Sequence, residues 1–376
     1  MSLLRLNVIL GIFPETGRFE KNRQQVISDY HDFLAYAESD ELARFEYLSK
    51  HLASPELDEL RNKRVKKKVI TFTQRIQQVI RAFRRSRLEE LEELENKPET
   101  DPDEIAALEE LAALENEFEQ IKKSKSLKKY LHSKANVSQF EPLTTWKLQF
   151  EDDFDATHLD TEKWLTRYFG AEKILKRSYS LWGDQQCLTE GENISLSNSK
   201  LSIETRPEEK KGIAWNPMAG FIPVEFPYTS GTVNTGKSFR FKHGKIEAKV
   251  KVPQGAAYHA FWLAGESVLP QINIFSYVKG KFYLGNFWGK LNDANGANHD
   301  ITALTGAFAG KSYIFSLEWS KKELVWAING VPMKTMTLGI PNDPMYIAFG
   351  SGVKTQKRSL KSPVKMEIDW VRYYSK

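Results

Sequence analysis

The pattern of apolar and polar positions changes about a third of the way along the chain. In the first part, apolar residues recur every three or four positions, as between Phe72 and Val79, which indicates helices with one apolar face. Farther on, apolar and polar residues alternate over short runs such as 245–252, which indicates half-buried strands. The pattern predicts a helical interaction domain at 1–140, followed by an all-β domain at 146–376.

Within the helical part we expect an antiparallel hairpin. One helix would run over about 67–95, and the other would start at Pro102 with Asp101 as its N-cap. The segment 96–99 would separate the two. Shorter helices are expected before the hairpin, around 23–37 and 40–52.

Charge is segregated along this hairpin. From Arg61 to Arg87 there are eleven Lys and Arg residues and no acid, whereas acids dominate 89–119. The simpler interpretation is a polar helical face that the neighbouring acidic helix neutralises. The alternative is a binding surface for a protein, an anionic lipid or a nucleic acid. A formal net charge of +5 is small for a dedicated nucleic-acid binder.

One predicted strand carries a row of neutral polar side chains. It reads Gln-Ile-Asn-Ile-Phe-Ser from residue 271. Because side chains alternate along a strand, Gln271 and Asn273 share one face with Phe275. A bulge after Ile274 would add one residue and bring Ser276 onto that face instead. The plain alternative is an ordinary half-buried strand whose amides face solvent.

The β part resembles glycoside hydrolase family 16, the laminarinase and lichenase type of β-glucanase. The resemblance rests on segments that occur in the family's order, at 150–155, 192–205, 228–235, 241–253, 260–263, 315–331 and 366–374. It implies a concanavalin A-like jelly roll of two packed sheets, with a cleft that holds a sugar chain. The hairpin signal Asn329-Gly330 agrees with an all-β domain.

The resemblance also places the family's Glu-x-Asp-x-x-Glu motif on Gln271, Asn273 and Ser276. Retaining glycosidases need two carboxyl groups roughly 5–5.5 Å apart, and neither amides nor a hydroxyl can replace them. No catalytic residue is therefore expected in this row. The favoured interpretation is a pseudo-glycosidase that binds a glycan, such as a β-glucan oligosaccharide, or a protein through the former cleft.

Two other functions stay open. The chain could hydrolyse O-glycosyl bonds of a β-glucan with displaced carboxylates, for which Asp184, Glu225 and Glu266 are the candidates. Alternatively, it could be a structural or assembly protein whose cleft is filled by its own side chains. Release of reducing sugar from a β-glucan would distinguish hydrolysis by displaced carboxylates from the pseudo-glycosidase and from the structural protein.

Aromatic side chains suggest where a sugar would bind, since pyranose rings stack on aromatic rings. All nine Trp lie from Trp146 onward. Trp262 fits a core position as well as a cleft position. The predicted substrate-binding residues are Trp182, Trp215, Tyr258, Trp262, Asn286 and Trp288.

The remaining signals restrict the class of protein. No His or Cys cluster suggests a metal site, and no cofactor is expected. One cysteine, Cys187, excludes an intramolecular disulfide. The apolar run 8–13 is too short to span a bilayer and lacks a signal-peptide cleavage site, so we expect a cytoplasmic protein without a transmembrane segment.

Overall fold

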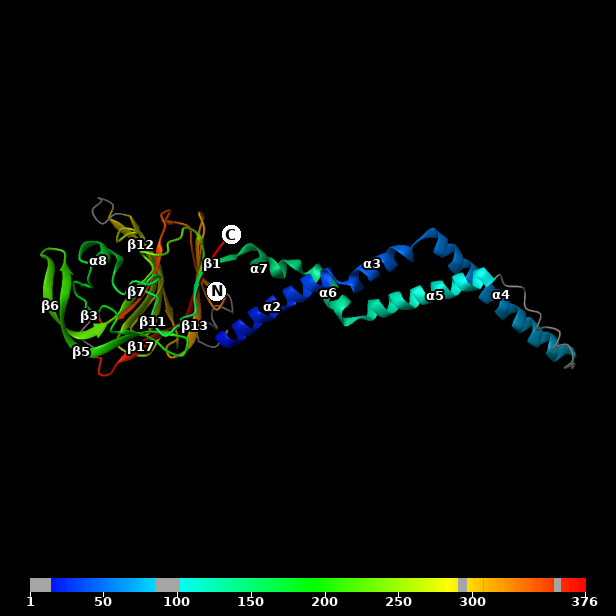
Figure 1. The fold of residues 1–376 in the computed structure, drawn as a ribbon, viewed down its shortest axis with the longest axis horizontal. Coiled ribbons are helices and arrows are strands. Elements are labelled where there is room, and N and C mark those ends of the chain that lie inside the picture. Colours follow the sequence, from blue (N-terminus) through cyan, green and yellow to red (C-terminus); the bar gives the residue numbers. More distant parts are fainter. Residues whose placement is uncertain (1–14, 86–101, 290–295, 307, 355–359) are drawn as a thin grey trace. The chain divides into compact units, whose positions relative to one another are not determined.

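The computed structural model describes residues 15–85, 102–289, 296–306, 308–354 and 360–376 (Figure 1). The chain divides into two compact units. One is helical and covers Gln24–Glu141, and the other is a β-sandwich that covers Pro142–Lys376 and also takes in the chain up to Arg23. The expected fold class, helices followed by a β-sandwich, is confirmed. The described residues 15–23 group with the sandwich, although the sequence had suggested that they belong to the helical domain.

The helical unit contains the short and long helices that the apolar spacing indicates. The helix α3 begins after Ser39, whose hydroxyl accepts a hydrogen bond from the Leu42 backbone N–H at 3.2 Å. The predicted N-cap Asp101, the break at 96–99 and the end of the predicted helix beyond residue 85 lie outside the described residues. The helices and turns are α2 (Thr16–Ala37), α3 (Asp40–His51), α4 (Pro55–Arg85), α5 (Pro102–Lys123), α6 (Lys125–Ala135), the 3₁₀ turn η3 (Val137–Phe140) and α7 (Glu141–Thr145).

The helix α5 buries its apolar stripe against α3 and the first turns of α4. Leu48 and Leu52 form a buried cluster with Leu111 of α5. Arg44 on α3 makes two hydrogen bonds of 2.7 Å to Glu117 of α5. The predicted hairpin is thus present, but α3 is a larger partner of α5 than the sequence suggested.

Two sheets form the sandwich. In the described residues, the larger sheet has the order β15-β14-β13-β8-β17-β5-β6-β3, with β1, β2 and β4 attached at its sides, and the second has the order β12-β11-β10-β9-β16-β7. The larger sheet is built from β1 (Lys147–Asp152), β2 (Ser180–Leu181), β3 (Gln186–Leu188), β4 (Ile194–Leu196), β5 (Leu201–Asn216), β6 (Gly220–Ser230), β8 (Gly244–Lys251), β13 (Ser312–Trp319), β14 (Leu324–Ile328), β15 (Val331–Met336) and β17 (Val364–Ser375). The second, six-stranded sheet is built from β7 (Thr232–Asn234), β9 (Tyr258–Ala264), β10 (Gln271–Val278), β11 (Lys281–Gly289), β12 (Ala297–Thr305) and β16 (Tyr346–Gly352), and α8 (Phe169–Ile174) lies in the connection between β1 and β2.

Large apolar side chains from both sheets fill the space between them. Phe275 of β10 meets Phe315 of β13 with ring centroids 4.4 Å apart, and both are buried. The predicted turn at Asn329 and Gly330 is confirmed: both residues have positive φ, 46° and 74°, as a two-residue type I′ hairpin requires. The core is therefore the one that alternation along the strands predicts.

The first turns of α2 dock on the larger sheet through a buried carboxylate. Arg23 contacts Glu247 of β8 at 2.7 Å, and Lys245 approaches the other oxygen at 2.9 Å, while the Glu247 side chain is only 3% exposed. Burial alone would raise the pKa of Glu247, but Lys245 and Arg23 outweigh it and hold the pKa below its usual value. Phe19 lies against Gly330, where a Cβ would come within 2.6 Å of its ring.

Helices that could cross a lipid bilayer are absent from the described part of the chain, because none is both long and apolar enough.

Candidate functional site

The strand β10 places three polar side chains on one face. Gln271 and Asn273 are half-buried, and the next two residues, Ile274 and Phe275, are both buried. The pairing of β10 with β9 and β11 shifts at this point, which is a β-bulge. Ser276 therefore returns to the half-buried face, so the bulge predicted from the sequence is confirmed.

The two amides of this row are bonded to each other. Gln271 Nε2 donates to Asn273 Oδ1 at 2.7 Å. This bond uses one donor of Gln271 and one acceptor of Asn273, so an amide carbonyl and an NH₂ group remain in the row for hydrogen bonds to a ligand. Because the groups are neutral, the row can bind hydroxyls but has no anionic oxygen that could act as a nucleophile.

Trp262 is the large aromatic residue beside this row. On β9, Trp262 pairs with Asn273, while its neighbours on the same face are the small Ala260 and Ala264. Its ring lies over Gly350 of β16, where a Cβ would be 3.2 Å from the ring. Of the two positions that the sequence allowed, Trp262 takes the one on the polar face.

The strand β11 adds two aromatic residues that the sequence did not single out. Phe287 pairs with Gln271, and Tyr283 pairs with Ser276, so both share the face of the polar row. Both side chains are half-buried. Together with Trp262, they border the three polar groups with aromatic surface.

Asn286 and Trp288 lie on the opposite face, which corrects their assignment to the cleft. Asn286 pairs with the buried Ile272, is itself fully buried, and donates from Nδ2 to the carbonyl of Gly339 at 2.7 Å. Trp288 packs against the core and against Gly339, where a Cβ would come within 2.2 Å of the indole. The physical reason is the register: alternation puts Phe287, rather than its two neighbours, beside Gln271.

Trp182 and Trp215 are exposed but belong to the larger sheet. The Trp182 N–H donates to the Trp215 carbonyl at 3.1 Å, next to the parallel pairing of β2 with β5. Their side chains are 57% and 41% exposed. The structure therefore brings these two residues together at the pairing of β2 with β5.

Tyr258, at the start of β9, lies in a polar cluster that the sequence did not indicate. Gln186 of β3 donates to the Tyr258 hydroxyl at 3.3 Å and accepts from the Val353 N–H at 2.7 Å. Gln186 is fully buried and occupies the space over Gly352, where a Cβ would come within 2.5 Å of its amide. Only the tertiary structure joins β3 to β9 and β16, so the residue order holds no signal for this contact.

The same cluster contains a carboxyl group with a perturbed pKa. Burial raises the pKa of Asp184, against the opposing effects of Lys354 and of the hydrogen bond from the Leu181 N–H. Burial also raises the pKa of Tyr258, and the charge of Asp184 raises it further. Burial raises the pKa of Tyr168 in the same way, with further contributions from Tyr258 and Asp184. The charge of Asp184 therefore acts on both phenols, Tyr168 and Tyr258.

The other two candidate acids are held by cations. Glu225 is exposed and contacts Lys211 at 3.1 Å. Glu266 pairs with Lys173 and with Arg240, the latter at 3.0 Å. Asp184, Glu225 and Glu266 therefore lie in three separate sets of contacts. In the described residues, no group of three or more His, Cys, Asp or Glu side chains could hold a metal ion.

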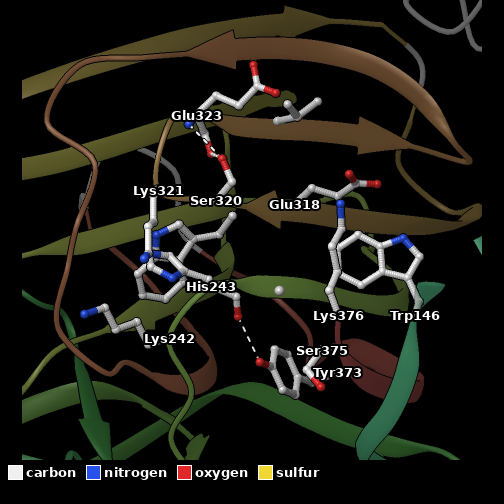
Figure 2. Close-up of a pocket in the computed structure, with 13 residues that line it drawn as sticks. Trp146, Lys242, His243, Glu318, Ser320, Lys321, Glu323, Tyr373, Ser375 and Lys376 are labelled. Carbon is white, nitrogen blue, oxygen red and sulfur yellow. Dashed lines mark hydrogen bonds between the residues drawn. The ribbon is translucent and has the colours of Figure 1, made fainter.

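A hollow of about 370 Å³ occurs elsewhere in the sandwich unit (Figure 2). Two of the residues that line the hollow are Trp146 and Lys376, and the Lys376 ammonium lies over the Trp146 ring, 4.7 Å from its centre. Burial lowers the pKa of His243, with Lys242 and Lys321 adding to the effect. None of the three residues of the β10 row, and none of the six predicted binding residues, lines this hollow.

Comparison with known proteins places the fold in a family. Residues 176–372 match the model of Glycosyl hydrolases family 16. Glucan endo-1,3-beta-glucosidase A1 of Niallia circulans is 23% identical over 274 residues, which is 60% of this chain and 37% of that protein. Endo-1,3-1,4-beta-glycanase ExsH of Rhizobium meliloti is 24% identical over 194 residues, which is 48% of this chain and 39% of that protein. The chain therefore spans less than half of the length of these relatives.

A solved structure shows the same fold. The structure of LamAcat from Zobellia galactanivorans superposes with a TM-score of 0.50 at 21% identity, and it covers 61% of this chain and 98% of that chain. The matched 61% of this chain is about as long as the sandwich unit.

Proposed function

Because the chain belongs to glycosyl hydrolases family 16 and presents amides and a hydroxyl on the β10 face, we propose that this face binds a neutral glycan without hydrolysing it. The observation that carries the proposal is the row of Gln271, Asn273 and Ser276 on one face, beside Trp262. In the alignment implied by the sequence motifs, these three positions are those of the family's carboxylates.

The chemistry of the face suits a sugar chain. Pyranose rings have apolar C–H faces and polar rims, so they match aromatic rings that are flanked by amides. Trp262, Phe287 and Tyr283 supply aromatic surface, and the row supplies a free amide carbonyl and NH₂ group. A β-1,3- or β-1,4-linked glucan is the first ligand to test, since one relative is named a glucan endo-1,3-beta-glucosidase and another an endo-1,3-1,4-beta-glycanase.

The same chemistry argues against turnover. A retaining mechanism needs one carboxylate as nucleophile and one carboxyl group as acid and base, roughly 5–5.5 Å apart. A hydrogen-bonded pair of amides supplies neither group. Binding can therefore persist where hydrolysis does not.

Turnover is tested by restoring the carboxylates. We expect no reducing sugar from laminarin or lichenan with the unmodified chain, and measurable release with the triple variant Gln271→Glu, Asn273→Asp, Ser276→Glu. A matched control carries the same kind of change at exposed strand and turn positions of the larger sheet, namely Ser195→Glu, Ser197→Asp and Thr335→Glu. Hydrolysis by the unmodified chain would end the proposal.

Binding is tested separately by calorimetry with gluco-oligosaccharides. We expect the unmodified chain to bind and Asn273→Ala to bind more weakly, because the replacement removes the NH₂ group from the row. Absence of binding to every β-glucan oligosaccharide, together with an inert triple variant, would favour a structural protein. The buried Gln186 over Gly352 is the observation that would then explain how one end of the face is filled.

Hydrolysis by displaced carboxylates is the competing function. Its best candidate is Asp184, since burial raises the pKa of this carboxyl group, as a catalytic acid requires. If the unmodified chain released sugar, Asp184→Asn should abolish the release, whereas Glu225→Gln, at an exposed ion pair with Lys211, should not.

A further inference from the structure

The helix α4 exposes a stripe of apolar side chains. Val65, Phe72, Ile76 and Val79 follow one another at spacings of seven, four and three residues, which places them on one side of the helix. Their exposed fractions are 58%, 67%, 43% and 59%, and Ile80 beside them is 49% exposed. At about 1.5 Å per residue, this stripe extends for roughly 22 Å along the helix.

The stripe lies in the acid-free segment of the chain. The eleven bases between Arg61 and Arg87 include Arg75, which is exposed in the middle of the stripe's length. A helix with one apolar face, a strongly basic polar face and few other apolar residues is typical of helices that lie in a membrane interface.

The acidic helix α5 forms ion pairs with the bases at the near end of this segment. Glu115 contacts Arg61 at 2.8 Å and Arg64 at 3.1 Å. Among the described residues, no ion pair is formed by Arg75, and the nearest pair along α4 is that of Arg64. Neutralisation by α5 is therefore seen at Arg61 and Arg64, and Arg75 is a described base beside the stripe that forms no ion pair.

The distribution of charge identifies the partner. A second copy of α4 packed along the stripe would bring two acid-free segments together and add like-charge repulsion. A coiled-coil partner would pair its acids with the positions that flank the stripe, but Thr73, Ile80 and Ala82 occupy three of these flanking positions. An anionic bilayer needs no such register, because its phosphates attract bases at any position, and its interior accepts apolar side chains.

We propose that α4 binds anionic lipid surfaces, with Val65, Phe72, Ile76 and Val79 entering the acyl boundary and Arg75 beside them contacting lipid phosphates. This activity is separate from glycan binding by the sandwich unit. It would hold the protein on a membrane without a segment that spans it.

The test is cosedimentation of the full chain with vesicles of phosphatidylcholine alone and of phosphatidylcholine with about a third phosphatidylglycerol. We expect binding to the anionic vesicles only, with a decrease as salt rises. The double variant Phe72→Ser, Val79→Ser and the single variant Arg75→Glu should each bind at least about tenfold more weakly. Because these side chains are exposed, both variants should keep the helical circular dichroism of the parent.

Ile105→Ser, at an exposed apolar position of the acidic α5, is the matched control and should bind as the parent does. A parallel binding assay with soluble poly-glutamate distinguishes an anionic lipid surface from an acidic protein as the partner. Binding to poly-glutamate without binding to anionic vesicles would overturn the proposal in favour of an acidic protein. Equal binding to both kinds of vesicle, or no loss in Phe72→Ser, Val79→Ser, would also overturn it.

Discussion

The indole N–H of Trp326 donates a hydrogen bond of 2.9 Å to the main-chain carbonyl of Asn273. Trp326 belongs to β14 of the larger sheet and is 1% exposed, whereas Asn273 lies where the pairing of β10 shifts. The bond thus crosses the core and satisfies a carbonyl beside the bulge. The bulge that brings Ser276 into the polar row is therefore tied to the opposite sheet.

Trp326→Phe should lower the free energy of unfolding by about 1–3 kcal/mol, because it leaves the Asn273 carbonyl buried without its donor. It should also weaken oligosaccharide binding, since the bulge loses its anchor. Trp319→Phe is the control: Trp319 is equally buried and donates to the Pro341 carbonyl at 3.2 Å, away from the row. Urea denaturation and calorimetry should show destabilisation in both variants and a loss of affinity in the first alone.

Trp262 and Trp288 should differ in what they contribute. Trp262→Ala should weaken glycan binding about tenfold, or on the order of 1.4 kcal/mol, because its ring is on the polar face. Trp288→Ala should destabilise the fold by about 3–5 kcal/mol and leave the affinity of the folded protein unchanged, because its ring packs on the core. Titration of both variants with laminari-oligosaccharides below their unfolding temperatures checks this. Equal losses of affinity would contradict the assignment of faces.

The buried His259 should make the sandwich acid-sensitive. Burial lowers its pKa to about 3, and its Nδ1 lies 2.8 Å from the Ser351 hydroxyl. The folded-state pKa of His259 is below the unfolded value of about 6.5, so the folded state prefers the neutral imidazole. The contribution of neutral His259 to the free energy of unfolding is therefore complete above pH 6.5 and is lost as the pH falls toward 3. Because one proton is taken up, the free energy of unfolding should fall by at most about 1.4 kcal/mol per pH unit.

His259→Asn keeps a partner for Ser351 but cannot take up a proton. We expect it to be less stable than the parent at pH 7 and to lose less of its stability between pH 6.5 and 4.5, as measured by urea midpoints. His158→Asn, at an exposed position, is the control. A parent and a His259→Asn variant with parallel pH profiles would show that this histidine does not control the acid response.

Arg23→Met should destabilise the sandwich by about 2–3 kcal/mol, because Glu247 would remain buried with Lys245 as its main partner. Lys21→Met, an exposed change of the same kind two residues away, should have little effect. All nine Trp lie from residue 146 onward, so tryptophan fluorescence reports the unfolding of the sandwich. Equal midpoints for the two variants would show that the start of α2 does not stabilise this unit.

Much of the fold follows from local patterns. Alternation predicts which residues of β10 face the core, and the Gln-Ile-Asn-Ile-Phe-Ser order even indicates a bulge, since only a bulge lets both Ile274 and Phe275 be buried. Apolar spacing likewise predicts α3 and α5. These features depend on residues that are close in sequence, so the sequence holds enough information for them.

The polar row is therefore determined by the sequence alone: its neutral groups, their spacing and the face that they share. Which aromatic rings accompany it was decided only by the tertiary structure, because the choice of Phe287 over Trp288 depends on strand register. The cluster of Gln186, Tyr258 and Asp184 and the Trp326 bond to Asn273 likewise join strands that are distant in the chain. Such contacts arise from the pairing and packing of whole sheets, and the order of residues within one strand does not specify its neighbour.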